Sequence, residues 1–110
     1  MIKKIFLVLI FTLWSFQAFA GIQEERLAFI QKLIKQGIFQ KVEVPCNLPH
    51  LWVKPASYAL DFDAKQKFVS VVYAYYITSN PKYNIVVLYD SKTGKEIGQY
   101  AEVYGGLKLK

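Results

Sequence analysis

The sequence predicts an α+β fold: a small antiparallel sheet of three to five strands, two helices packed on one face, and a C-terminal β-hairpin. Three observations lead to this prediction. Segments 23–36 and 63–76 repeat apolar residues at helical spacing. Several short segments alternate apolar and polar residues, as strands do. A turn sequence at 90–95 separates two of these strands. Since two amphipathic helices need one apolar surface to cover, a single sheet is the economical partner.

Residues 1–20 have the features of a secretory signal peptide. Lys3 and Lys4 precede an apolar run over 5–16, and a small-x-small cleavage site ends at Ala20. The run is shorter than the roughly 20 residues that span a bilayer, which favours cleavage over an uncleaved anchor. We therefore expect cleavage after Ala20 and a periplasmic or secreted product, folded as one small α+β domain over 21–110.

The composition limits which classes of molecule we expect as a partner. Cleavage would leave twelve Lys and Arg against eight Asp and Glu, a net charge of +4, with Arg26 as the one arginine. Arginine supplies the bidentate groups that read bases and grip phosphates, so we do not expect nucleic acid as a partner. Cys46 is the one cysteine, so no intrachain disulfide can form and the fold depends on its hydrophobic core.

The segment 23–36 predicts the first helix. Acidic residues occupy its first turn and lysines its last, which matches the helix dipole. Gly37 suits the left-handed position that follows a helix, with Ile38 folding back on the last turn. A membrane-surface role for this basic amphipathic helix is an alternative, although its mixed charges favour a solvated outer face. The predicted apolar stripe comprises Leu27, Ile30, Leu33 and Ile34.

The segment 63–76 is the densest apolar run after the signal peptide, and two periods fit it. The helical reading gives Asp63 the role of N-cap and Gln66 that of its capping-box partner. The strand reading explains the β-branched and aromatic residues equally well. We favour the helix, because only the helix gives both polar residues a role. The helical stripe is Ala64, Phe68, Val71, Val72, Tyr75 and Tyr76, and the strand face is Val69, Val71, Tyr73, Tyr75 and Ile77.

The remaining segments predict strands and turns. Segment 83–89 is apolar almost throughout, which is typical of a strand covered on both faces in the middle of a sheet. Its hairpin partner is 96–103, joined to it by a turn in which Asp90 bonds the backbone and Gly94 takes a positive φ. Segment 56–62 fits either a strand or a helical turn. Further strands are predicted at 39–44, 51–53 and, as an edge guarded by lysines, 107–110.

Few residues suggest catalysis. Cys46 and His50, spaced C-x-x-x-H, are the one pair that fits a thiolate nucleophile and its base. A metal site needs three or four ligands, and this loop offers two. Asp61 and Asp63 form a carboxylate pair if the segment is extended, but helix capping explains them more simply. We assign no catalytic, cofactor-binding or metal-binding residues and expect no cofactor.

The aromatic residues suggest binding. Tyrosine and tryptophan are enriched at interfaces, although core packing explains any single one of them. The sequence therefore predicts a non-enzymatic binding protein of the cell envelope whose partner is a protein or another envelope macromolecule. A small envelope hydrolase or thiol enzyme using Cys46 and His50 is the alternative from another class. The aromatic candidates for an exposed sheet face are Trp52, Tyr73, Tyr83, Tyr89, Tyr100 and Tyr104.

Overall fold

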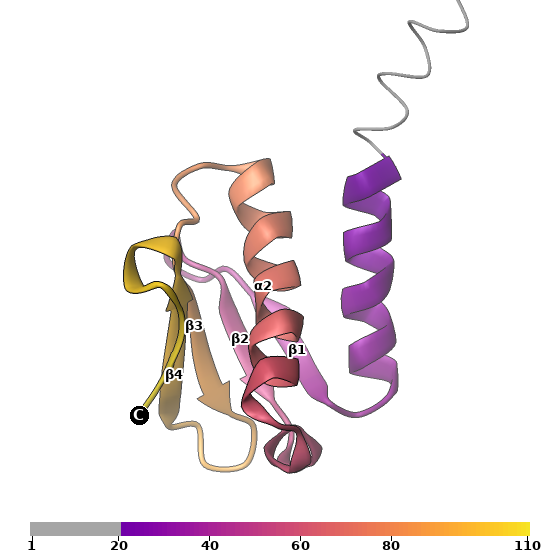
Figure 1. Cartoon of the computed structure of the whole chain (residues 1–110), viewed down its shortest axis with the longest axis vertical. Helices are drawn as coiled ribbons and strands as arrows, with labels where there is room; N and C mark the ends of the chain where they lie inside the picture. Colours follow the sequence, from indigo (N-terminus) through magenta and orange to yellow (C-terminus); the bar gives the residue numbers. More distant parts are fainter. Residues whose placement is uncertain (1–20) are drawn as a thin grey trace, which may run out of the picture.

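A computed structural model describes residues 21–110 (Figure 1). The predicted signal peptide, 1–20, lies outside the described residues. Within them, two helices lie against a five-stranded sheet, which confirms the predicted α+β fold. The elements are an N-terminal helix over 21–35, β1 (Phe39–Glu43), β2 (His50–Val53), the 3-10 helix η1 (Pro55–Ala59), α2 (Phe62–Ser79), β3 (Val86–Asp90), β4 (Glu96–Ala101), the 3-10 helix η2 (Glu102–Tyr104) and β5 (Gly106–Leu109).

The sheet runs in the order β1-β2-β3-β4-β5 and is mostly antiparallel. The β2–β3 pair is parallel, which the sequence analysis did not predict. The physical reason is the connection: η1 and α2 carry the chain back along the sheet before β3 begins, and parallel neighbours need such a crossover. β3 is the middle strand, as predicted, and three consecutive residues of it, Val86, Val87 and Leu88, are buried.

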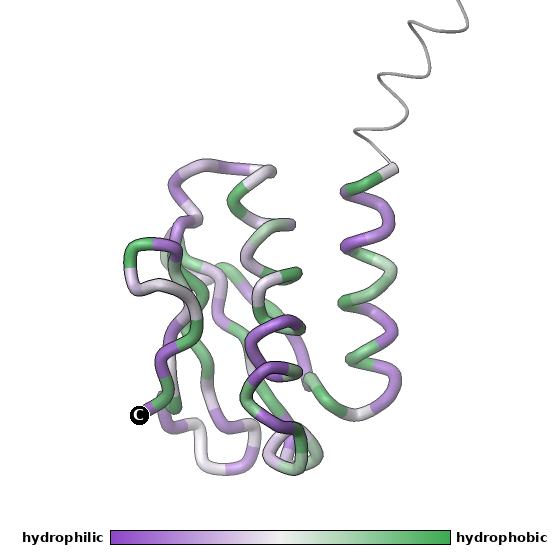
Figure 2. Tube along the Cα trace, viewed as in Figure 1, coloured by the Kyte–Doolittle hydropathy of each residue, from purple (hydrophilic) through white to green (hydrophobic). Residues whose placement is uncertain are grey.

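The N-terminal helix ends as the sequence predicts. Gly37 has a φ of +80°. Its N–H donates to the carbonyl of Ile34, and the N–H of Ile38 donates to that of Leu33, which is the Schellman pattern. Ile30 and Leu33 are buried in the core, whereas Leu27, predicted to share their stripe, is 37% exposed. Hydrophobic and hydrophilic residues alternate around this helix (Figure 2).

Segment 63–76 is helical, which resolves the choice of period, but its predicted cap is wrong. Asp61, not Asp63, is the N-cap: its Oδ1 accepts from the backbone N–H of Ala64 at 2.8 Å. Gln66 makes no capping box. Its Oε1 accepts from the N–H of Leu107 at 3.1 Å and so ties α2 to β5. The helix begins two residues earlier than the cap prediction implied and ends later, at Ser79.

The buried side of α2 also differs in part from the prediction. Val72, from the predicted stripe, is fully buried, but its deepest companions are Val69 and Tyr73, which the sequence analysis placed on the strand-period face. The reason is that α2 lies over the sheet and beside the N-terminal helix (Figure 1), so more than one stripe of α2 is covered. Phe68 contacts Phe29 of the N-terminal helix, with ring centroids 5.6 Å apart.

One hydrophobic core joins both helices to one face of the sheet. Polar contacts reinforce the pairing of the helices, since Arg26 Nη1 donates to Thr78 Oγ1 at 3.2 Å. None of the helices in residues 21–110 has the length and hydropathy needed to cross a membrane. The buried cluster consists of Ile30, Leu33, Phe39, Leu51, Val53, Val69, Val72, Tyr73, Val86, Leu88 and Leu107.

Two connecting segments form a 3-10 helix and a turn. Segment 56–62, which fitted either a strand or a helical turn, contains η1. The turn after β3 forms as predicted: Asp90 Oδ2 accepts from the N–H of Thr93 at 2.8 Å, and Gly94 has a φ of +72°. β4 and β5 are antiparallel neighbours that form the C-terminal hairpin, with β5 at the edge of the sheet.

Candidate functional site

The strands divide their residues between two faces of the sheet. Successive side chains on a strand point to opposite sides. Leu51, Val53 and Leu88 belong to the core beneath the helices, so their neighbours along the strands lie on the other side, here called the helix-free face. Two rows of paired residues cross it. The first row consists of Lys41, Trp52, Tyr89 and Glu96. The second row consists of Glu43, His50, Val87, Gln99 and Lys108.

Trp52 lies at the centre of the first row, between two partners. Its ring stacks on that of Tyr89, with centroids 4.8 Å apart and planes inclined by 25°. On the other side, from β1, Lys41 places its ammonium 5.2 Å from the ring centroid, within range of a cation–π interaction. Lys41 also forms an ion pair with Glu43 at 2.9 Å. Trp52 is therefore held between Tyr89 and Lys41 across the three strands.

His50 extends this aromatic group. Its ring lies 4.9 Å from that of Tyr89, inclined by 43°. Trp52, Tyr89 and His50 are each half-buried rather than covered. These three residues, here called the aromatic group, occupy neighbouring positions on β2 and β3. Their side chains restrain one another, so little conformational entropy remains to be lost on binding.

The Cys46–His50 pair spans the connection from β1 to the start of β2. Cys46 is exposed in the loop between β1 and β2, and its thiol makes no hydrogen bond to the imidazole among the described residues. His50 is instead engaged with Tyr89. Within residues 21–110, no side chain is hydrogen bonded to the imidazole to orient it, as in a base that activates a thiol.

The six aromatic candidates lie in different environments in the structure. Trp52 and Tyr89 lie on the helix-free face. Tyr104 is 41% exposed and stacks beneath the ammonium of Lys108, at 5.6 Å. Tyr73 and Tyr100 lie on the other side, where their rings meet between α2 and β4 with centroids 5.1 Å apart. Tyr83 packs on Tyr76 of α2. Tyr73, which is 7% exposed, is a core residue, in agreement with the packing role that the sequence favoured for any single aromatic residue.

The acidic candidates have structural roles. Asp61 caps α2, and Asp63 is an exposed residue of its first turn. Asp90 accepts from the Tyr58 hydroxyl at 2.6 Å as well as from Thr93, and these hydrogen bonds lower the pKa of its carboxyl. Across residues 21–110, no three His, Cys, Asp or Glu side chains are grouped as a metal site would require.

The charges around the aromatic group were not predicted from the sequence. Lys41 and Glu43 lie at the β1 end of the rows, and Lys108 lies at the β5 end. Glu96 pairs with Lys110, and the hydrogen bond between them lowers the pKa of the Glu96 carboxyl. Strand alternation alone gives the face of each residue, but the pairing register is needed to place them in one row.

Comparisons with known protein families, with curated proteins and with solved structures found no match.

Proposed function

We propose that the protein is an exported, non-enzymatic binding protein of the cell envelope that docks a protein partner on the helix-free face. The observation that carries this proposal is the half-exposed stack of Trp52 on Tyr89, with His50 beside it. Tryptophan and tyrosine are the residues that most often dominate the binding energy of an interface. Charged residues at both ends of the rows supply the polar rim that surrounds such a centre.

The geometry favours a protein over a glycan or a nucleic acid. Sugars and nucleobases are held by stacking on an open aromatic face. Trp52 offers less open ring surface than such a platform, because Tyr89 stacks on it and the Lys41 ammonium lies 5.2 Å from its ring centroid. Arg26, the one arginine, is hydrogen bonded to Gln23 and Thr78 on the helix side. The ring edges of the aromatic group and the hydroxyl of Tyr89 remain for contact with a partner. The side chains and backbone of a protein can contact such groups.

The other two functions considered lack such support. A membrane-surface helix needs a free apolar stripe, whereas Ile30 and Leu33 of the N-terminal helix are buried in the core. A thiol enzyme needs an activated cysteine, and Cys46 is exposed without a hydrogen-bonded base among the described residues.

The proposal is tested by site-specific photo-crosslinking in the native envelope. A crosslinking residue replaces Gln99 or Glu43 on the helix-free face, or Lys32 on the outer side of the N-terminal helix. We expect one protein species to be captured from both positions on the face and not from Lys32. Trp52→Ala should weaken this capture about thirtyfold, which corresponds to the ~2 kcal/mol of a strong interface residue.

Controls keep the outcome unambiguous. Tyr104→Ala removes an exposed aromatic outside the aromatic group and should leave capture unchanged. Circular dichroism of the Trp52→Ala variant checks that it folds. Equal capture from Lys32 would contradict the proposal, as would tight binding to purified peptidoglycan stripped of protein.

A further inference from the structure

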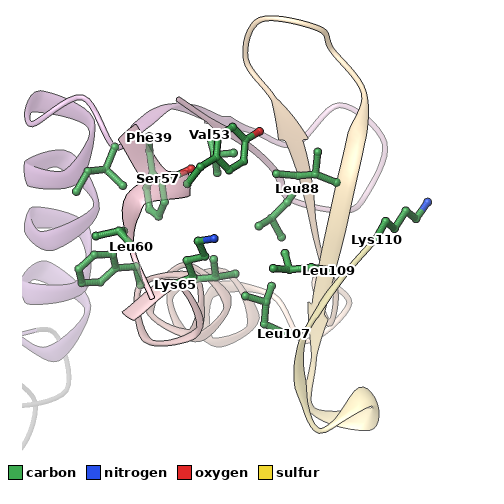
Figure 3. A pocket seen from close by; sticks show the side chains of 14 residues that line it. Phe39, Val53, Ser57, Leu60, Lys65, Leu88, Leu107, Leu109 and Lys110 are labelled. Carbon is green, nitrogen blue, oxygen red and sulfur yellow. The ribbon is translucent and has the colours of Figure 1, made fainter. Parts of the chain in front are cut away.

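A cavity of about 350 Å³ lies on the helix side of the sheet, away from the helix-free face. It is bounded by η1, the first turns of α2 and the strands, including β5 (Figure 3). Its wall is mainly apolar, with Phe39, Val53, Leu88 and Leu107 at the buried end. Cavities that hold small ligands have this size and character.

Two lysines line the cavity, and only one faces it. The Lys65 side chain extends toward the middle of the cavity, whereas Lys110 points away (Figure 3). Lys110 is paired with Glu96. Lys65 takes part in neither of the salt bridges found in residues 21–110. Its ammonium lies 6.0 Å from the ring centroid of Tyr58. A positive charge without a salt-bridge partner in residues 21–110 therefore faces an apolar space.

Ser57 and Tyr58 of η1 complete the polar part of the wall. The Tyr58 hydroxyl is committed, because it donates to Asp90 at 2.6 Å and so fixes η1 against the end of β3. The Ser57 side chain is buried at 6% exposure, and no hydrogen bond of its hydroxyl is found in the described part of the chain. Ser57 thus adds a hydroxyl to the wall of the cavity that Lys65 faces.

We propose that this cavity binds a medium-chain fatty acid, with the carboxylate on Lys65 and the alkyl chain against the apolar wall. The charge of the ligand follows from the ammonium, which attracts an anion and repels a cation. The size follows from the volume: a dry cavity of about 150 Å³ holds a benzene ring, so this one accommodates roughly a dozen heavy atoms. Decanoate, with ten carbons and two oxygens, has that size.

The experiment is isothermal titration calorimetry of the exported protein with decanoate and with decyltrimethylammonium, both below their micelle concentrations. The two amphiphiles share a chain length and differ in the sign of the head group. We expect decanoate to bind at one site and the cation at least tenfold more weakly. Lys65→Gln should weaken decanoate binding about tenfold, while the matched control Lys67→Gln, an exposed lysine of α2 outside the cavity, should not change it.

A second variant tests the position of the chain. Leu60→Trp places a large ring at the wall of the cavity, and should abolish decanoate binding while leaving the amide spectrum of the sheet unchanged. The proposal is overturned if decanoate does not bind, if both amphiphiles bind alike, or if Lys65→Gln and Lys67→Gln behave the same. None of these outcomes bears on crosslinking from the helix-free face, so this inference and the proposed function can fail separately.

Discussion

The hydrogen bond between Tyr58 and Asp90 joins η1 to the turn after β3, and it sets the ionisation of both side chains. The ring of Tyr58 is half exposed, but desolvation of its hydroxyl, followed by the bond to Asp90, raises the pKa of Tyr58 to about 12 from its usual 10.0. The same bond, with those from the Thr93 backbone, lowers the pKa of Asp90. The neutral phenol and the charged carboxylate are thus the forms that the fold stabilises.

These pKa shifts predict a stability window. The contribution of Asp90 is present above its unfolded pKa, near 3.9, and is lost as the pH falls through the lower folded value. The contribution of Tyr58 is present below pH 10 and is lost as the pH rises toward about 12. We expect Tyr58→Phe to lower the free energy of unfolding by about 1 kcal/mol at pH 7. Urea titrations from pH 3 to 11 should show this difference shrinking at both ends, and a constant difference would contradict the account.

The aromatic residues show that residue type alone does not decide whether a side chain lies in the core or on the surface. Tyr73 and Tyr89 are alike in type and both stand among apolar neighbours, yet one is in the core and the other on the helix-free face. Sequence composition identified both as candidates. Tyr73 lies on the buried side of α2, whereas the pairing register of β3 places Tyr89 on the helix-free face.

At the scale of elements, a helix end was predicted correctly where one residue suited the terminal position, and incorrectly where two residues did. Gly37 is the one glycine between the first helix and β1, so its left-handed position was unambiguous. Asp61 and Asp63 are both good caps, two residues apart. Gln66, the predicted capping-box partner of Asp63, instead bonds β5, an element more than 40 residues away that no local pattern contains.

The N-cap predicts different costs for two neighbouring substitutions. Asp61→Ala removes the acceptor of the Ala64 N–H and should lower the free energy of unfolding by about 1 kcal/mol. Asp63→Ala removes only a favourable charge near the helix N-terminus and should cost about 0.3 kcal/mol. Chemical denaturation of the two variants measures both values. A larger loss for Asp63→Ala would restore the cap predicted from the sequence.

The bond from Leu107 to Gln66 holds the edge strand β5 to α2. Gly106 permits the approach, since a Cβ there would lie 2.5 Å from Gln66 Oε1. Gln66→Leu leaves the Leu107 N–H without this acceptor and should cost about 1–2 kcal/mol, whereas Gln66→Glu keeps an acceptor and should cost less. Hydrogen exchange at Leu107 should accelerate in the first variant only. Equal exchange in both variants would show that the bond does not hold β5.

At the scale of the whole molecule, the sheet separates two surfaces of different chemistry. Its helix side encloses the core and the cavity that Lys65 faces, and its other side carries the aromatic group. The fold class could be predicted from periodicity because each element has its own pattern. The cavity could not, since its fourteen lining residues come from seven elements or their connections and have no shared local signature.

Hydroxyl-radical footprinting with mass spectrometry tests most directly whether the helix-free face is the docking surface. The purified protein is labelled alone and after mixing with envelope extract. The account predicts that labelling of Trp52 and Tyr89 falls on mixing, while that of Tyr58, which is 48% exposed beside the cavity, does not change. Unchanged labelling of Trp52 and Tyr89, or protection confined to Tyr58, would contradict it.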